Sequence, residues 1–347
     1  MLYFLFYYCA TTLLYTMEKN SYDFELGKIK ELIKERGARR AGLQLPGGIK
    51  TVATDIAAEI SKETGTEVII SGNSCYGACD IDEKLMRNVD MLFHFGHTDT
   101  FSFYKRKPVL KENYQKKVVF IELRSGIDVK PAVEKAVAEI KGDMVGLVAT
   151  VQHVHALKEA EILLARLGKK AIIGKSRLKY DGQVLGCEFS SAAVPCDEIL
   201  FVGSGSFHPA GLALYTGKRV IAADPFTMQI GVYEADELRK KRYLVIARAL
   251  DAKSVGIIIG MKSGQFELGK AIELKRRTVE KGLNAYLVTM DEITEDNLLA
   301  FNVDAFVNTA CPRLVEDFTH FKKPVLSIKE FEVVLGERRW EDCFVLP

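Results

Sequence analysis

The chain lacks a strong excess of charge of either sign. Its 347 residues include 48 Lys and Arg against 46 Asp and Glu, so the formal net charge is only +2. A nucleic-acid-binding protein usually shows a basic excess or a basic stripe, whereas the basic residues here form only short clusters, such as residues 105–107. We therefore expect no nucleic-acid partner.

Long hydrophobic runs are also missing. Residues 1–16 are almost wholly apolar and aromatic, but they have no basic start and are shorter than the ~20 residues of a membrane span. We interpret them as a non-native extension ahead of a natural start at Met17, with a membrane anchor or an ordered N-terminal element as alternatives. Because no later segment is long and apolar enough for a span, we expect a cytoplasmic protein without a membrane partner.

Two familiar cofactor motifs are absent. No G-x-G-x-x-G follows a predicted strand, and no G-x-x-x-x-G-K-[ST] occurs, which argues against the usual dinucleotide and phosphate loops. The seven cysteines form no C-x-x-C pair. An odd number of cysteines in a long chain is not typical of a secreted disulfide scaffold. Reduced thiols, some of them metal ligands, fit the sequence better.

Short apolar, β-branched runs recur along the chain and alternate with amphipathic helices. Such runs are typical of buried parallel strands. In three groups of four, the predicted strands are 41–45, 67–71, 91–95 and 118–123; 144–151, 170–173, 198–203 and 219–223; and 254–260, 284–289, 304–307 and 324–328. The clearest helices are predicted over 46–62, 157–167 and 266–281.

This alternation predicts an α/β fold built from βαβ units. We expect three similar small domains, each a four-stranded parallel sheet flanked by helices. The predicted domains are residues 17–126, 127–228 and 229–347, after the extension 1–16. The segments around the two inner boundaries are not Gly/Ser-rich, so the domains should pack closely.

Three cysteines occupy comparable loops of the three groups. Cys79 and Cys187 follow the second strand of groups one and two, and Cys311 follows the third strand of group three. Ligands of open parallel sheets bind outside the carboxyl ends of the strands. Glycine or alanine beside each cysteine would let a bulky cofactor approach the backbone. We expect Cys79, Cys187 and Cys311 to bind one metal centre together.

Three thiolates suit either zinc or an iron–sulfur cluster. A structural zinc site would want a fourth ligand and usually a C-x-x-C pair. Cys75 and Cys79 are four residues apart, but Asp82 stands where a C-x3-C-x2-C motif would have its third cysteine. Cys75 is therefore the member of the cysteine set most easily mistaken for a ligand.

Several short motifs together resemble the archaeal diphthamide synthase iron–sulfur subunits, and they span all three groups. The segments that carry the resemblance are LQLPGG (43–48), YGACDID (76–82), LGC (185–187), GSFHP (205–209), KSGQ (262–265) and TACPR (309–313).

The resemblance implies a homodimer of three-domain subunits. It implies a 4Fe-4S cluster bound by Cys79, Cys187 and Cys311, with S-adenosylmethionine as cosubstrate. An electron donor would reduce the cluster, and the electron passed to the sulfonium would break the bond between sulfur and the methionine Cγ. The resulting 3-amino-3-carboxypropyl radical would attach to a histidine of elongation factor 2.

The carboxylate of that cosubstrate needs hydrogen-bond donors. Arg313 could bind it with two parallel hydrogen bonds, and Gln265 lies in a Ser-Gly-Gln loop after a predicted strand. Ser263 and His208 are the next candidates.

Two other functions remain open at this stage. A quinolinate-synthase-like dehydratase also has three similar α/β domains and a cluster on three cysteines, where the open iron acts as a Lewis acid. A non-catalytic subunit would carry a cluster that never meets the cosubstrate.

Overall fold

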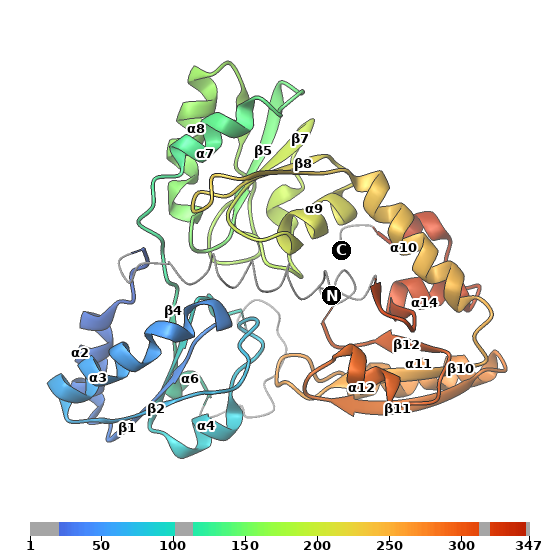
Figure 1. Cartoon of the computed structure of the whole chain (residues 1–347), viewed down its shortest axis with the longest axis horizontal. Coiled ribbons are helices and arrows are strands. Elements are labelled where there is room, and N and C mark those ends of the chain that lie inside the picture. Colours follow the sequence, from blue (N-terminus) through green and yellow to red (C-terminus); the bar gives the residue numbers. More distant parts are fainter. Residues whose placement is uncertain (1–20, 101–113, 312–319, 345–347) are drawn as a thin grey trace, which may run out of the picture. The chain divides into compact units, whose positions relative to one another are not determined.

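The computed structural model describes residues 21–100, 114–311 and 320–344 (Figure 1). The chain divides into two compact units, Met1–Ile127 and Asp128–Pro347. The extension predicted for residues 1–16 lies outside the described residues. Within the described ranges, no helix is both long enough and apolar enough to cross a membrane.

The first unit contains a parallel sheet of four strands in the order β2-β1-β3-β4. The strands are β1 (Arg40–Gln44), β2 (Glu67–Ile70), β3 (Met91–Phe95) and β4 (Val118–Ile121). The helices are α2 (Leu26–Arg36), the 3-10 helix η1 (Gly47–Val52), α3 (Ala53–Thr64), α4 (Glu83–Asn88) and α6 (Tyr114–Lys117). Every residue of β3 is buried, as expected for an inner parallel strand that is covered on both faces.

Helices α2 and α3 cover this sheet because each has an apolar stripe. Ile29 and Ile33 of α2, and Ile56 and Ile60 of α3, are four residues apart and lie in the same core cluster as the β1 and β3 side chains. Residues at this spacing share one helix face. The sheet and its helices therefore form one continuous core.

The second unit contains two sheets. The first has the order β6-β5-β7-β8-β9. Its strands are β5 (Met144–Ala149), β6 (Lys170–Ile172), β7 (Glu198–Val202), β8 (Val220–Ala223) and β9 (Ile230–Tyr233). Its helices are α7 (Lys130–Val137), η2 (Val154–Ala156), α8 (Leu157–Arg166), η3 (Ser190–Ala192) and α9 (Phe207–Thr216). All pairs in it are parallel except β8 with β9.

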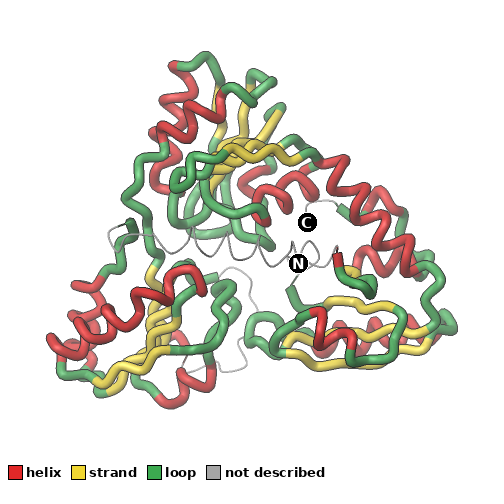
Figure 2. The backbone as a smooth tube through the Cα atoms, viewed as in Figure 1, coloured by secondary structure: helices red, strands yellow, loops and turns green. Residues whose placement is uncertain are grey.

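The second sheet of this unit is parallel, with the order β11-β10-β12-β13. Its strands are β10 (Ser254–Gly260), β11 (Asn284–Met290), β12 (Ala305–Asn308) and β13 (Val325–Ser327). Its helices are α10 (Ala235–Ala249), α11 (Leu268–Glu280), α12 (Glu295–Leu299), α14 (Ile328–Val334) and η5 (Trp340–Asp342). Figure 2 shows helices lying against the sheets of this unit.

The two sheets of the second unit share a core. Leu214 of α9 packs in one cluster with Val245 of α10 and Val255 of β10. A fully buried ion pair adds to this packing: the Arg242 guanidinium of α10 binds both carboxylate oxygens of Glu330 in α14, at 2.8 and 2.9 Å. Removing one partner of such a pair would leave an uncompensated buried charge, so the loss of either side chain should destabilise the contact between α10 and α14.

The predicted α/β fold is confirmed, and all twelve predicted strands are present with boundaries shifted by at most a few residues. The sheet of the second group differs from the expected four strands by one, because β9 adds an antiparallel edge. The four residues of β9 lie at a predicted domain boundary. In the sequence, so short a run looks like a loop, because only its pairing with β8 makes it a strand. The division into three domains stays a prediction.

Candidate metal centre

Cys79 lies on a tight turn in the loop between β2 and α4. The Asp80 N–H donates to the Gly77 carbonyl at 2.9 Å, and the Tyr76 N–H donates to the Asp80 carboxylate at 3.1 Å. The Gln44 side chain at the end of β1 donates to the Asp80 carbonyl at 2.7 Å. A Cβ at position 77 would lie 3.4 Å from the half-buried Cys79 Sγ, in ordinary van der Waals contact, so Gly77 lies directly beside the thiol.

The same loop is joined to α4 through Asp82. Its carboxylate accepts hydrogen bonds from Ser71 Oγ (2.7 Å), Asn73 Nδ2 (2.9 Å) and the Leu85 N–H (2.9 Å), while its own N–H donates to Gln44 Oε1 (3.0 Å). Partial burial opposes the charge, but the three donors outweigh it and hold the pKa of Asp82 below its ordinary value. Asp82 is therefore ionised, and it caps α4.

Cys187 occupies the tip of a two-residue hairpin turn. The Leu185 N–H donates to the Glu188 carbonyl at 3.0 Å, and the Glu188 N–H donates back to the Leu185 carbonyl at 3.1 Å. Gly186 and Cys187 are the two residues between them, and the Cys187 side chain is exposed. The turn therefore presents the thiol to solvent.

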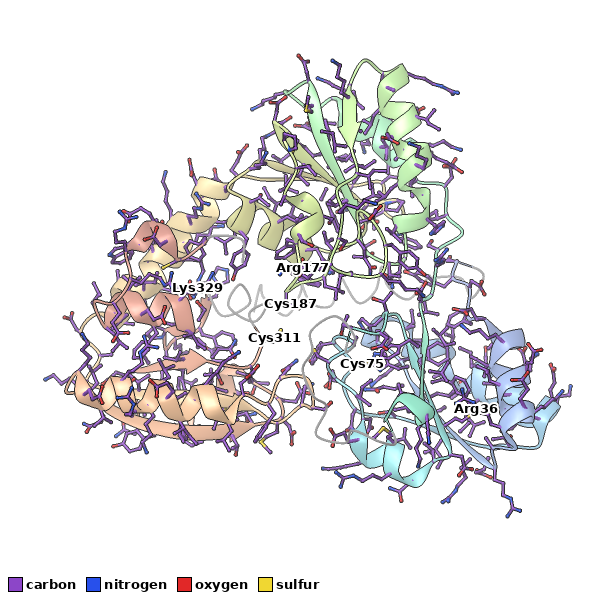
Figure 3. All side chains as sticks on the ribbon, turned by 180° about the vertical axis from the view of Figure 1, so that it is seen from behind. Arg36, Cys75, Arg177, Cys187, Cys311 and Lys329 are labelled. Carbon is purple, nitrogen blue, oxygen red and sulfur yellow. The ribbon has the colours of Figure 1, made fainter. Side chains whose placement is uncertain are left out.

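The base of this hairpin is tied to the carboxyl edge of the sheet. Gln183 forms a parallel bridge with Ala149, the last residue of β5. The buried Glu188 carboxylate accepts from the Ser190 N–H at 2.7 Å and pairs with Arg177 at 3.0 Å. Figure 3 labels Arg177 and Cys187 on this segment.

Cys311 follows β12, and the side chain of Asn308, the last residue of that strand, holds it in a turn. The Asn308 side chain donates to the Cys311 carbonyl at 2.7 Å and accepts from the Ala310 N–H at 2.9 Å. The Thr309 hydroxyl donates to the Ile258 carbonyl of β10 at 2.7 Å. The backbone of Cys311 is thus set at the end of the sheet, and its thiol is half-buried.

Each of the three loops, taken by itself, presents a thiol of the kind that binds iron–sulfur clusters. Each of Cys79, Cys187 and Cys311 carries a reduced thiol, follows a parallel strand and lies on a hydrogen-bonded turn that leaves this thiol at least partly exposed. Thiolates presented in this way are the ligands that such clusters require. Cys187 and Cys311 belong to the second unit, where Figure 3 labels both, and Cys79 belongs to the first.

The predicted cosubstrate residue Gln265 lies beside the Cys311 loop. Both depend on Gly260 at the end of β10, where an added Cβ would lie 2.6 Å from the Ala310 Cβ and 3.3 Å from the Gln265 Cβ. Ser263 lies in the same loop, and its buried Oγ has no hydrogen-bond partner among the described residues. Glycine at position 260 is what lets these two loops meet.

The other two residues predicted to bind the cosubstrate are His208 and Arg313. His208 is the second residue of α9, and its ring stacks on Phe201 of β7, with centroids 5.7 Å apart. Arg313 lies outside the described residues, so its contact stays a prediction.

A further histidine lies at the carboxyl edge of the first sheet of the second unit. His153 follows β5, and its ring packs edge-on against Phe226 with centroids 5.7 Å apart. Burial, with a smaller contribution from His155, lowers the pKa of His153 to about 4 against the opposing charge of Asp224. The imidazole is therefore neutral near pH 7.

Residues that hold the cysteine loops were missed in the sequence, chiefly Gln44 and Asn308. Gln44 lies inside the LQLPGG segment and Asn308 three residues before Cys311. A polar residue at the end of a buried strand was the available signal, because such a side chain must find a partner or leave a polar group unsatisfied.

A family model for diphthamide synthesis proteins matches residues 45–345, a range that includes all three cysteine loops. The chain belongs to this family. This membership favours the transferase over the quinolinate-synthase-like alternative. The family match also agrees with the resemblance seen in the short motifs.

Two relatives show how far the likeness to diphthamide synthesis proteins extends. The chain is 37% identical over 317 residues to 2-(3-amino-3-carboxypropyl)histidine synthase of Pyrococcus horikoshii, an alignment that covers 89% of each protein. It is 30% identical over 332 residues to 2-(3-amino-3-carboxypropyl)histidine synthase subunit 1 of Nematostella vectensis, covering 93% of this chain and 70% of the relative.

Two solved structures of Dph2 from Pyrococcus horikoshii share the fold of this diphthamide family member. Each has a TM-score of 0.80 and 34% sequence identity, over 91% of this chain and 92% of the other. One of the two is the structure of that protein with a 4Fe-4S cluster. The three-sheet α/β architecture therefore belongs to the family.

Proposed function

We propose that this protein transfers the 3-amino-3-carboxypropyl group of S-adenosylmethionine to a histidine of elongation factor 2, the first step of diphthamide biosynthesis. The observation that supports this most is the set of three turn-held cysteines at sheet edges, in a family where a structural relative binds a 4Fe-4S cluster. The relatives named 2-(3-amino-3-carboxypropyl)histidine synthase support the same reaction.

Cys79, Cys187 and Cys311 would hold the cluster. The chemistry that a reduced cluster supplies is one-electron reduction of the sulfonium, which cleaves the bond between sulfur and the methionine Cγ. Three cysteines leave one iron of a 4Fe-4S cluster without a protein ligand, and that iron is where S-adenosylmethionine would bind. The contribution of the protein is to position the cosubstrate beside the electron source.

The loop of Ser263 and Gln265 is the proposed site for the amino acid end of the cosubstrate. It lies beside the Cys311 loop because Gly260 permits their contact. The Ser263 hydroxyl and the Gln265 amide can donate hydrogen bonds to a carboxylate. His208 and Arg313 complete the proposed set, with Arg313 as the charged partner.

The protein partners follow from this function. Elongation factor 2 is the proposed substrate, a second copy of the chain the proposed dimer partner, and a separate electron donor is required. The proposed compartment is the cytoplasm, where elongation factor 2 works in translation.

The test is an anaerobic reaction of the cluster-loaded, reduced protein. With S-adenosylmethionine alone we expect methylthioadenosine and 2-aminobutyrate-type products, and with elongation factor 2 a histidine carrying the added group, read by mass spectrometry. Absence of both products from a protein with a full cluster would contradict the proposal.

Calorimetric titration with S-adenosylmethionine separates the enzyme from a non-catalytic subunit. An enzyme binds the cosubstrate, whereas a subunit that only carries a cluster shows no heat of binding. Ser263→Ala and Gln265→Ala should weaken this binding while the iron content stays unchanged.

A further inference from the structure

A second group of metal-ligating side chains lies in the first unit, apart from the three cysteines above. It consists of Cys75, His94 and His97, and one ligand atom from each lies within 4.8 Å of the others. The Cys75 Sγ is 3.8 Å from His94 Nε2, and His94 Nε2 is 2.9 Å from His97 Nδ1. Cys75 and His94 are buried, and His97 is half-buried.

The fold brings these residues together across one strand. Cys75 follows β2, His94 is in β3, and β1 lies between the two strands in the sheet. His97 turns back toward His94 because Gly96 has a φ of +86°, in the left-handed region that favours glycine. The loop after β2 therefore crosses the end of β1 to meet both imidazoles.

The Gln44 amide orients the central imidazole. Its Nε2 donates to the Asp80 carbonyl and its Oε1 accepts from the Asp82 N–H, which fixes the orientation of the amide. The same Oε1 lies 3.0 Å from His94 Nδ1, so Nδ1 carries the proton. The lone pair of His94 Nε2 then points toward Cys75 and His97. Metal-bound histidines are oriented by hydrogen bonds of this kind.

The distances are close to those of a tetrahedral zinc site. Zinc–nitrogen bonds of about 2.0 Å and zinc–sulfur bonds of about 2.3 Å place two nitrogens about 3.3 Å apart, and sulfur and nitrogen about 3.5 Å apart. The observed 2.9 and 3.8 Å differ from these values by a few tenths of an ångström. The ligand atoms of Cys75 and His97 lie within 4.8 Å of each other, and the two imidazole nitrogens must separate by a few tenths of an ångström to admit the ion.

We propose that Cys75, His94 and His97 bind one zinc ion, separate from the iron–sulfur cluster. One thiolate and two imidazoles are ligands that zinc accepts, and the fourth tetrahedral position is left to water. The ion joins the loop after β2 to the turn after β3. Since Cys79 lies four residues beyond Cys75 in that loop, the zinc site stabilises the segment that presents a cluster ligand.

The test uses the full chain with its cluster in place, supplied with zinc chloride and dialysed against metal-free buffer. Zinc and iron are counted by mass spectrometry, and absorption at the zinc K-edge reports the ligands without interference from iron. We expect about one zinc per chain, with one sulfur and two nitrogens as protein ligands.

Matched variants assign that zinc to the site. Cys75→Ser and His97→Gln should each lose the zinc and keep the iron, whereas Cys196→Ser, which changes a cysteine of the second unit, should keep both. Gln44→Ala removes the hydrogen bond that orients His94 and should weaken zinc binding about tenfold or more.

Two results would overturn the zinc site. One is a wild-type protein that retains no zinc after dialysis. The other is zinc surrounded by three sulfurs that persists in Cys75→Ser and disappears in Cys79→Ala, because that ion would occupy the cluster cysteines. Neither result affects the proposed transferase, since iron content and methylthioadenosine formation are measured on the same samples.

Discussion

A side-chain amide holds the Cys79 loop and another holds the Cys311 loop. The number of residues between the amide and the loop differs greatly between the two. In each case a side-chain amide at the end of a strand donates to a backbone carbonyl of the loop at 2.7 Å. Gln44 reaches a residue 36 positions away, whereas Asn308 reaches one only three positions away. The Cys79 loop therefore depends on the assembled sheet, and the Cys311 turn is largely local.

The environments of the two amides differ as well. Gln44 contacts Asp80, Asp82 and His94, so it connects the loop, the start of α4 and the inner strand β3. Among the described residues, the side-chain hydrogen bonds of Asn308 stay within its own turn, with Ala310 and Cys311. A change at Gln44 should spread through the first unit, and a change at Asn308 should stay near Cys311.

The largest expected effect comes from the ligands themselves. Cys79→Ala, Cys187→Ala and Cys311→Ala should each abolish the cluster, because each removes one of three thiolates. Iron and sulfide content and anaerobic spin-resonance spectra measure this. Cys75→Ala is the control and should keep four irons. A cluster lost with Cys75→Ala but kept with Cys79→Ala would reverse the assignment of the two neighbouring cysteines.

The next largest effect is expected from Gly260→Ala. Its Cβ would lie 2.6 Å from the Ala310 Cβ, and overpacking of this kind costs about 1–3 kcal/mol. Cluster content and S-adenosylmethionine affinity should fall together, because the Gln265 and Cys311 loops both move. Ala310→Gly removes the opposing methyl group and should restore much of the loss in the double variant. If Ala310→Gly restores nothing, this contact is not the cause.

Gln44→Ala tests the hydrogen bonds that connect the end of β1 to the distant Cys79 loop. It leaves the Asp82 N–H, the Asp80 carbonyl and His94 Nδ1 without their amide partner, and a buried unsatisfied group costs about 1–3 kcal/mol. We expect a lower free energy of unfolding in urea and a lower iron content. The Glu31→Gln variant, at an exposed position of α2, serves as a control and should change neither quantity.

Asn308→Ala tests the hydrogen bonds within the Cys311 turn and should lower the free energy of unfolding by less than Gln44→Ala. Two hydrogen bonds within one turn are lost, at a cost of about 1 kcal/mol each, against three polar groups left without a partner in Gln44→Ala. Asn308→Asp keeps an acceptor for the Ala310 N–H but loses the donor to the Cys311 carbonyl, which separates the two contributions. A larger loss of stability for Asn308→Ala than for Gln44→Ala would contradict the contrast between the loops.

The smallest expected effect is a dependence of stability on pH that comes from Asp82. Its pKa is lower in the folded protein than in the unfolded chain, so its stabilising contribution is complete above the unfolded value near 4. That contribution is lost as the pH falls through the folded value. Comparing the wild type with Asp82→Asn in acid unfolding of the cluster-free protein should show a shallower loss for the variant. Identical curves would mean that Asp82 contributes nothing.

The sequence supported the strand predictions because buried parallel strands are apolar throughout and are bounded by polar loops. β3 and β10 were located to the residue. β9 was missed because its four residues gain their strand identity only by pairing with β8. The position of Cys79 after β2 was likewise readable, whereas its attachment to Gln44 was not, since hydrogen bonds across 36 residues leave no periodic signal.

The amino-acid sequence by itself determined the α/β class, the twelve strands and the three cysteines in loops at strand ends. These features follow from local hydrophobic patterns and from residue types that stand next to one another. Only the tertiary structure decided that α9 joins the core of the next sheet, that Gly260 lets the Gln265 loop meet Ala310, and that Cys75 meets two histidines across β1. Such contacts join residues far apart in the chain, and packing selects them among many alternatives that the same local sequence would allow.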